Sequence, residues 1–125
     1  MITVRDLEDM GYFDEFNVVN ADPTQDYSYW VEGKIVTEGK DRLIENVLGL
    51  VGEAGEVAEK IKKNIRDDTR FSDLEILKEL GDVLFYVTAL ANYYDKNLGY
   101  VMELNVKKLD DRQGRGVLKG NGDNR

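Results

Sequence analysis

The sequence predicts an all-α protein, a bundle of about four helices that is completed by oligomerisation. The chain has 125 residues, of which 42% are hydrophobic and 34% are charged, and it contains a single proline. A disordered chain would be less apolar, and a β-sandwich would need more turn residues. Apolar residues also recur at helical spacing over long segments. The length suits one domain with one core.

Three segments of the chain differ in character. Residues 1–21 are an N-terminal extension of unknown role, with a short helix over Val4–Phe16 as one interpretation. Residues 22–113 carry the helical patterns and are predicted to form the folded domain. Residues 114–125 are a tail that is glycine-rich and locally basic.

The first predicted helix covers Gln25–Val36 and includes Trp30, and Gly39 is expected to close it. Asp22-Pro23 is its start signal, because proline is tolerated at the first helical position. The second predicted helix runs from Asp41 to about Arg66. Its expected core face consists of Leu43, Val47, Leu50, Ala54, Val57, Ala58, Ile61 and Ile65.

Ser72 and Glu75 match the S-x-x-E capping box, so a third helix is predicted from about Asp73 to about Tyr94. A fourth helix is predicted over Leu98–Arg112. The expected core face of the third helix consists of Leu77, Leu80, Val83, Leu84, Val87 and Ala91.

Composition excludes several classes of function. A formal net charge of −8 argues against nucleic acid and anionic membranes as partners, and polyanionic substrates would need a cation as a bridge. The chain shows neither a bilayer-spanning apolar run nor a signal peptide, and it has no cysteine, so we expect a cytoplasmic location. The sequence has no histidine, which excludes Ser-His-Asp and Cys-His catalysis and a zinc site with histidine ligands. Acid–base chemistry is then left to carboxylates, Lys, Tyr or metal-bound water.

Two pairs of acids are the strongest chemical signal. Glu53 and Glu56 lie in the second helix and Glu79 and Asp82 in the third, each pair with a three-residue spacing that places both acids on one helical face. If the pairs face each other, each close contact costs roughly 2–4 kcal/mol in repulsion. Mg²⁺ held by these carboxylates would offset it. Solvated surface acids are the alternative interpretation.

Other residues beside the acids allow two interpretations. Lys60 and Lys63 either screen Glu56 and Glu59 on the helix surface or contact phosphate. Gly49, Gly52 and Gly55 lie within the same helix, and each destabilises it by about 1 kcal/mol relative to alanine. Glycines at these positions indicate either the close approach of a ligand or tight helix packing.

The segments GLVGEAGEVAEKIKK, ELGDVLFYV and NVKKLDDRQGRG together resemble the MazG-like family of all-α nucleoside triphosphate pyrophosphohydrolases, from about Trp30 to the tail. The resemblance implies that Glu53, Glu56, Glu79 and Asp82 are catalytic and hold Mg²⁺, with Mn²⁺ as a possible substitute. It also places Tyr86, Asn105 and Lys108 near the nucleotide. Further candidates for substrate contact are Lys60, Arg112 and Trp30.

The resemblance implies hydrolysis of a nucleoside triphosphate to a monophosphate and pyrophosphate by metal-activated water, in a homodimer or homotetramer. Two alternatives stay open: a related diphosphohydrolase acting on a nucleotide such as phosphoribosyl-ATP, and a noncatalytic helical module stabilised by metal. A di-iron carboxylate bundle is disfavoured because no histidine is present.

Overall fold

The computed structural model describes residues 22–67, 70–116, 120 and 122. Over these residues the chain is all-α and contains no strand, as the sequence predicts. The helix proposed within residues 1–21 lies outside the described residues, as does most of the tail. The four helices are α2 (Pro23–Lys34), α3 (Gly39–Arg66), α4 (Asp73–Tyr93) and α5 (Leu98–Gly114).

Helix α2 begins at the predicted start signal, Asp22-Pro23, two residues before the predicted first residue Gln25. Oδ1 of Asp22 accepts hydrogen bonds from the backbone N–H groups of Thr24 and Gln25, and Pro23 is the first helical residue. The prediction that Gly39 closes this helix is wrong: α2 ends at Lys34, and Gly39 opens α3 with φ +60°. A left-handed residue is needed to turn the chain into α3, and glycine adopts that conformation without a Cβ penalty.

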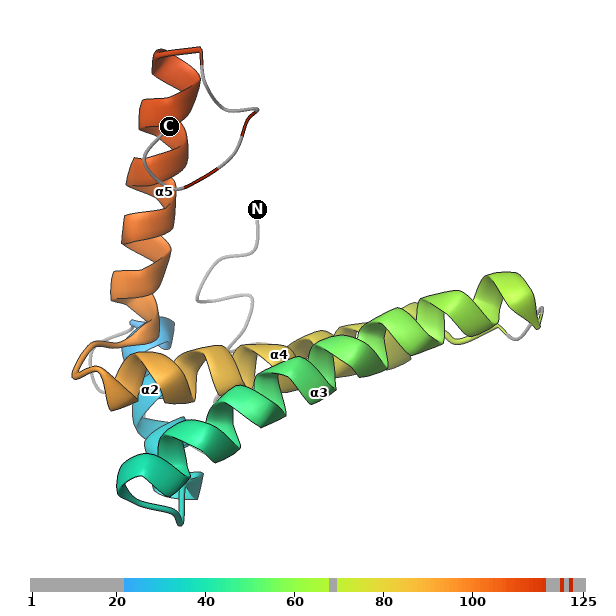
Figure 1. Cartoon of the computed structure of the whole chain (residues 1–125), viewed down its shortest axis with the longest axis horizontal. Helices are drawn as coiled ribbons and strands as arrows, with labels where there is room; N and C mark the ends of the chain where they lie inside the picture. The colour runs from blue at the N-terminus through green and yellow to red at the C-terminus, as the bar shows by residue number, and fades with distance from the viewer. Residues whose placement is uncertain (1–21, 68–69, 117–119, 121, 123–125) are drawn as a thin grey trace.

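Helices α3 and α4 lie side by side as an antiparallel pair, which is the longest part of the molecule (Figure 1). The capping box at the start of α4 is present, with Ser72 and Glu75 satisfying each other's backbone N–H groups. The backbone N–H of Phe71 donates to Oδ1 of Asn64 at 2.9 Å, which fixes the approach to α4 against the end of α3.

The face of α3 that packs against α4 differs from the predicted core face. Among the predicted core residues, Val47, Ile61 and Ile65 of α3 are exposed, as are Leu77, Leu80 and Leu84 of α4. The seam, meaning the face of α3 turned toward α4, includes the buried or half-buried positions Leu43, Asn46, Leu50, Glu53, Val57, Lys60 and Asn64. This seam therefore includes an acid and a lysine. Helical periodicity locates an apolar stripe, but it does not say which neighbour covers it.

One apolar face of the α3–α4 pair is left uncovered by the residues that the structure describes. On α3 and α4 its exposed residues are Ile44, Val47, Leu48, Val51, Ile61, Ile65, Leu74, Leu77, Leu80 and Leu84. Around the axis of each helix, the exposed apolar residues lie about 120° from the residues that face the other helix, in the same rotational sense on both helices. Because the two helices run antiparallel, the two apolar stripes therefore lie on the same side of the pair.

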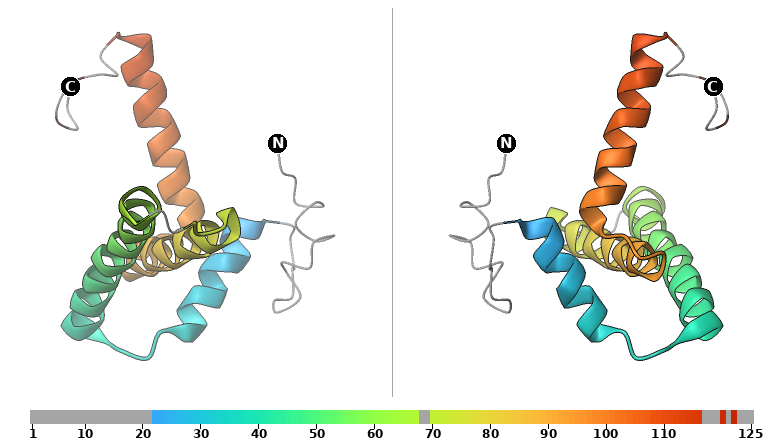
Figure 2. Two further views of the ribbon diagram at one scale, coloured as in Figure 1. Left: turned by 90° about the vertical axis from the view of Figure 1, so that its right-hand side faces the viewer. Right: turned by 90° about the vertical axis from the view of Figure 1, so that its left-hand side faces the viewer.

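Helices α2, α4 and α5 meet in a small buried junction. Val31 of α2 and Ala89 of α4 are fully buried there. Oγ of Ser28 accepts from the N–H of Leu98 at 3.1 Å, and Asn92 donates to the carbonyl of Ser28 at 3.0 Å. These bonds tie α4 and the start of α5 to α2, whereas the rest of α5 projects away from the α3–α4 pair (Figures 1 and 2).

Two further observations complete the fold. Arg42 of α3 makes a bidentate ion pair with Glu32 of α2, with N–O distances of 2.8 and 2.6 Å, and this pair fixes α2 relative to α3. Within the described residues, none of the helices combines the length and the apolar character that crossing a membrane requires.

Candidate metal centre

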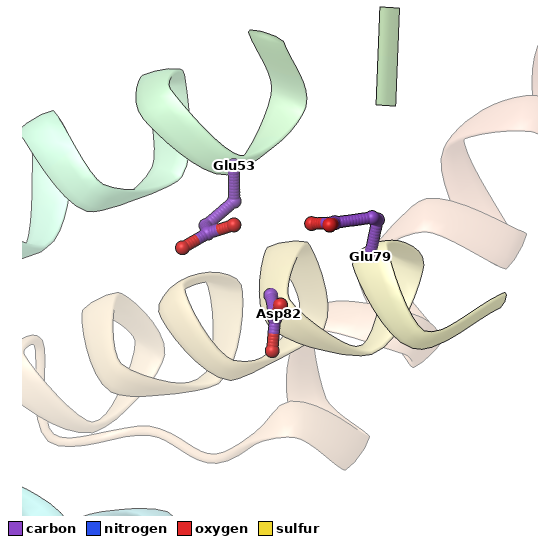
Figure 3. Close-up of side chains that lie close together, drawn as sticks. All are labelled: Glu53, Glu79 and Asp82. Carbon is purple, nitrogen blue, oxygen red and sulfur yellow. The ribbon is translucent and has the colours of Figure 1, made fainter. Parts of the chain in front are cut away.

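The structure brings three of the four predicted acids together. Glu53 projects from α3 toward α4, Glu79 reaches from α4 into the space between the helices, and Asp82 lies on the next turn of α4 (Figure 3). One carboxylate oxygen from each of the three residues lies within 4.8 Å of the other two. Two consecutive helices thus present a single cluster of carboxylates.

Glu56 lies outside this close group of oxygens, and its side chain is exposed. It follows Glu53 by one turn of α3, on the side away from the seam. Its charge still contributes to the raised pKa of Glu53, so it belongs to the same electrostatic environment.

The surroundings of Glu53 disfavour its ionised form. Burial raises the pKa of Glu53 above its ordinary value of 4.5, and the charges of Asp82, Glu79 and Glu56 raise it further, as does a hydrogen bond with Glu79. Desolvation and like charge both favour the neutral acid. The cluster is therefore repulsive at neutral pH unless a cation joins it.

We predict that Glu53 makes the metal-free protein less stable as pH rises. The folded chain binds this proton more tightly than the unfolded chain, since the pKa of Glu53 is raised on folding. The stabilisation is present at low pH and is lost as pH increases through the raised pKa, upward of about 4.5. Urea unfolding with excess chelator should show that Glu53→Gln flattens this loss relative to Glu45→Gln, which removes an exposed acid from α3. A wild-type minus Glu53→Gln stability difference that grows with pH would contradict the assignment.

The donor set fits a hard divalent cation. Mg²⁺ takes oxygen ligands at about 2.0–2.1 Å, so two ligands of one ion are at most about 4.2 Å apart. The carboxylate oxygens lie within 4.8 Å of one another, slightly more than this limit, so the side chains would have to move closer together to share one ion. Histidine and cysteine are absent from the sequence, which excludes the donors that zinc and copper sites prefer.

Lys60 crosses from α3 to this cluster. Its Nζ lies 3.5 Å from Oε1 of Glu79 and 4.7 Å from the centre of the Phe71 ring. The expectation that Lys60 screens acids on its own helix is wrong for this residue, because its partner is on α4. Lys63 does pair on its own helix, with Glu59 at 3.8 Å.

Tyr86 packs on the glycine that precedes the acids. A Cβ at Gly49 would overlap the ring of Tyr86, whereas a Cβ at Gly52 or Gly55 would meet nothing within 4 Å. Of the two interpretations of these glycines, tight packing therefore holds for Gly49. The surface at Gly52 and Gly55 is open beside the acids.

Gly49→Ala is expected to destabilise the protein, and Gly52→Ala to stabilise it. Alanine improves helix propensity by about 1 kcal/mol at either position. At Gly49 that gain is outweighed by forcing the Tyr86 ring out of place, an overpacking cost of about 1–3 kcal/mol. Denaturant unfolding of the two variants should give shifts of opposite sign, and equal shifts would show that Tyr86 moves freely.

Trp30 lies in an aromatic cluster between α2 and α4. It stacks on Tyr27 with ring centres 5.7 Å apart and meets Phe85 edge-on at 6.1 Å. Nζ of Lys34 lies 5.4 Å from its ring centre. Phe85 in turn meets Tyr86 edge-on at 5.2 Å, so the cluster is continuous with the side chain that packs on α3.

Tyr27 is a further candidate for the site that the sequence analysis did not name. Burial raises the pKa of Tyr27, and the charge of Asp82 adds to that shift, which places the phenol near the acidic cluster. The available signal was its spacing: Tyr27 precedes Trp30 by three residues and shares its face of α2.

The three candidates on α5 are not brought to the acids within one chain. Asn105 and Lys108 are exposed on the part of α5 that projects away from α3 and α4 (Figure 2). Arg112 is buried, and its Nη2 donates to the carbonyl of Gly122 at 3.3 Å. On the surface of the same helix, Asp111 pairs with Arg115 at 2.8 Å and Glu103 pairs with Lys107 at 2.8 Å.

The fold and the cluster define an all-α protein with a carboxylate centre between two antiparallel helices. The family model of the MazG nucleotide pyrophosphohydrolase domain matches residues 42–116, and the chain belongs to this family. The matched segment contains every acid of the centre and all of α5, and it omits α2 with Tyr27 and Trp30.

Comparison with curated proteins finds similarity to the Gene 37 protein of Mycobacterium phage L5. The two sequences are 49% identical over 82 residues, which cover 62% of this chain and 72% of the phage protein. No solved structure matches the chain.

Proposed function

We propose that this protein hydrolyses a nucleoside triphosphate to a monophosphate and pyrophosphate, with Mg²⁺ as cofactor and Mn²⁺ as a substitute. The observation that carries the proposal is the convergence of Glu53, Glu79 and Asp82 within 4.8 Å, inside the segment that matches a nucleotide pyrophosphohydrolase domain. The donor set contains oxygen only, as a Mg²⁺–phosphate site requires.

The acids supply a fixed negative centre for the cation, and Glu56 extends it toward solvent. When bound, a divalent cation neutralises phosphate charge and lowers the pKa of water enough for attack. Attack on the α-phosphorus breaks the bond to the bridging oxygen of the α–β anhydride, and pyrophosphate leaves with that oxygen. The chain binds and orients the substrate, and no histidine is needed.

Basic and polar side chains outside the acids complete the proposed substrate site. A triphosphate carries more negative charge than bound cations neutralise, so Lys108 is our principal candidate for a phosphate contact, with Asn105 one turn away on α5. Lys60 is a second candidate beside the acids. Arg112 is proposed to contact the substrate from its buried position. Trp30 and Tyr27 are proposed to border the base.

We propose that the active form is a homodimer or homotetramer. Ten large apolar side chains of α3 and α4 are exposed on one side of the helix pair, and such contiguous patches are uncommon on monomers. Glu56 and Asp82 point to the other side of the seam, so an interface on the apolar side leaves the acids accessible. A partner chain would also provide the α5 that this chain does not bring to its own acids.

The proposal is tested with a panel of ribo- and deoxyribonucleoside triphosphates, assayed for monophosphate and pyrophosphate by chromatography. We expect both products in equal amounts with Mg²⁺ or Mn²⁺ and none in excess chelator. Phosphoribosyl-ATP belongs in the panel as the alternative substrate. Binding of metal with no turnover of any nucleotide would support a noncatalytic metal-stabilised module instead.

A further inference from the structure

Lys60 is held in the acidic centre by contacts from two sides. Its ammonium lies 3.5 Å from Glu79 and 4.7 Å from the centre of the Phe71 ring. The side chains of Lys60 and Glu79 are only 22% and 19% exposed. An ion pair shielded to this degree is less screened by water than a surface pair.

The other lysines near the end of α3 do something different. Lys62 and Lys63 both pair with Glu59 of their own helix, at 3.9 and 3.8 Å, and their side chains are 57% and 42% exposed. Such pairs are common helix-surface contacts with small energies. Lys60 alone among these three carries its charge across the seam to a residue of the carboxylate cluster.

We propose that Lys60 is the resident counterion of the centre, paired with Glu79 in the metal-free protein and displaced from that carboxylate when a divalent cation binds. Glu53, Glu79 and Asp82 place three carboxylates close together, and Lys60 offsets part of their repulsion. The same ammonium competes with a cation for Glu79. Lys60 thus stabilises the empty centre and weakens its affinity for metal.

Phe71 gives the displaced ammonium a place to stay. The backbone N–H of Phe71 is bonded to Asn64, which holds this residue against the end of α3, and its ring centre lies 4.7 Å from Nζ of Lys60. An aromatic face attracts a cation without offering it an anion, so Lys60 can release Glu79 and keep the ring contact. The released charge then lies beside the phosphates of a bound substrate.

The inference rests on the proposed metal centre and is tested without nucleotide. Titration calorimetry with MgCl₂ alone compares the wild type with Lys60→Met, which keeps length and removes charge. We expect Mg²⁺ to bind Lys60→Met about three- to tenfold more tightly, because one competitor for Glu79 is gone. Lys62→Met is the matched control, with an expected change of less than about twofold, and Lys60→Arg should stay near the wild type.

The thermal stability of the same variants provides a second measurement. In excess chelator Lys60→Met should melt below Lys62→Met, and added Mg²⁺ should raise its melting temperature by more than that of the wild type. If Lys60→Met does not fold without metal, the titration with MgCl₂ is made with Lys60→Gln instead.

The outcomes separate the two proposals. Mg²⁺ binding by the wild type with unchanged or weaker affinity in both neutral variants would overturn the counterion role and leave the proposed function standing. If the nucleotide assay showed a higher KM for Lys60→Met while its Mg²⁺ affinity was unchanged, the counterion role would also be overturned. Lys60 would then be a phosphate contact only. Failure of the wild type to bind Mg²⁺ would count against the metal centre itself.

Discussion

Asp82→Asn is expected to abolish pyrophosphate release while leaving a folded protein. The substitution keeps shape and removes one of three converging charges, so the centre holds its cation less well and stabilises the phosphates less. Loss of such a charge in a reactive centre lowers turnover by roughly 10²–10³-fold or more. The metal-free fold should be unharmed or slightly more stable, because the lost charge repels Glu53. Initial rates at saturating Mg²⁺ and circular dichroism measure the two effects.

Glu45→Gln is the control for Asp82→Asn, since it removes one carboxylate from an exposed position of α3 outside the seam. It should retain wild-type turnover. If Asp82→Asn unfolded the metal-free chain, Asp82 would be structural; if it stayed active, the centre would lie elsewhere.

Lys108→Ala is expected to lower kcat/KM for nucleotides about ten- to a hundredfold, the loss of one charge-assisted contact to phosphate. Its Mg²⁺ affinity without nucleotide should be nearly unchanged, because Lys108 is proposed to contact phosphate and not the carboxylates that hold the cation. Lys107→Ala is the matched control: Lys107 is the next residue along, exposed and paired with Glu103 at 2.8 Å. Equal kinetics for the two variants would remove Lys108 from the substrate site.

Mixing the two impaired variants tests whether α5 acts on a partner chain. If each site combines the acids of one chain with α5 of the other, a heterodimer of Asp82→Asn and Lys108→Ala has one intact site of two. Random exchange makes half of the dimers heterodimers, so about a quarter of wild-type activity should return. No recovery after subunit exchange would place all site residues within one chain.

Local sequence signals predicted the helices well. Asp22-Pro23 and the Ser72–Glu75 box start helices as expected, since a cap is satisfied by residues within one turn. The termini of α3, α4 and α5 fall within two residues of the predicted positions. The exception was Gly39, which was expected to end α2 but begins α3 in a left-handed conformation. A glycine between two helical patterns is compatible with either position.

The acids were visible in the sequence, but their grouping was decided by the tertiary structure. The spacing of Glu53, Glu56, Glu79 and Asp82 set which acids share a helical face. Which of them converge depends on how α3 is rotated against α4, and that rotation turned Glu56 toward solvent and Lys60 toward Glu79.

The sequence by itself determined an all-α chain with capped helices and two acidic pairs, because these follow from residues a few positions apart. Only the tertiary structure decided that the seam carries Glu53 and Lys60 while Leu48, Val51 and Leu80 stay exposed, that Tyr27 lies near Asp82, and that α5 points away. Periodicity defines the faces of a helix, but contacts between distant segments choose which face is buried, and here the most apolar faces find no cover within the described part of one chain.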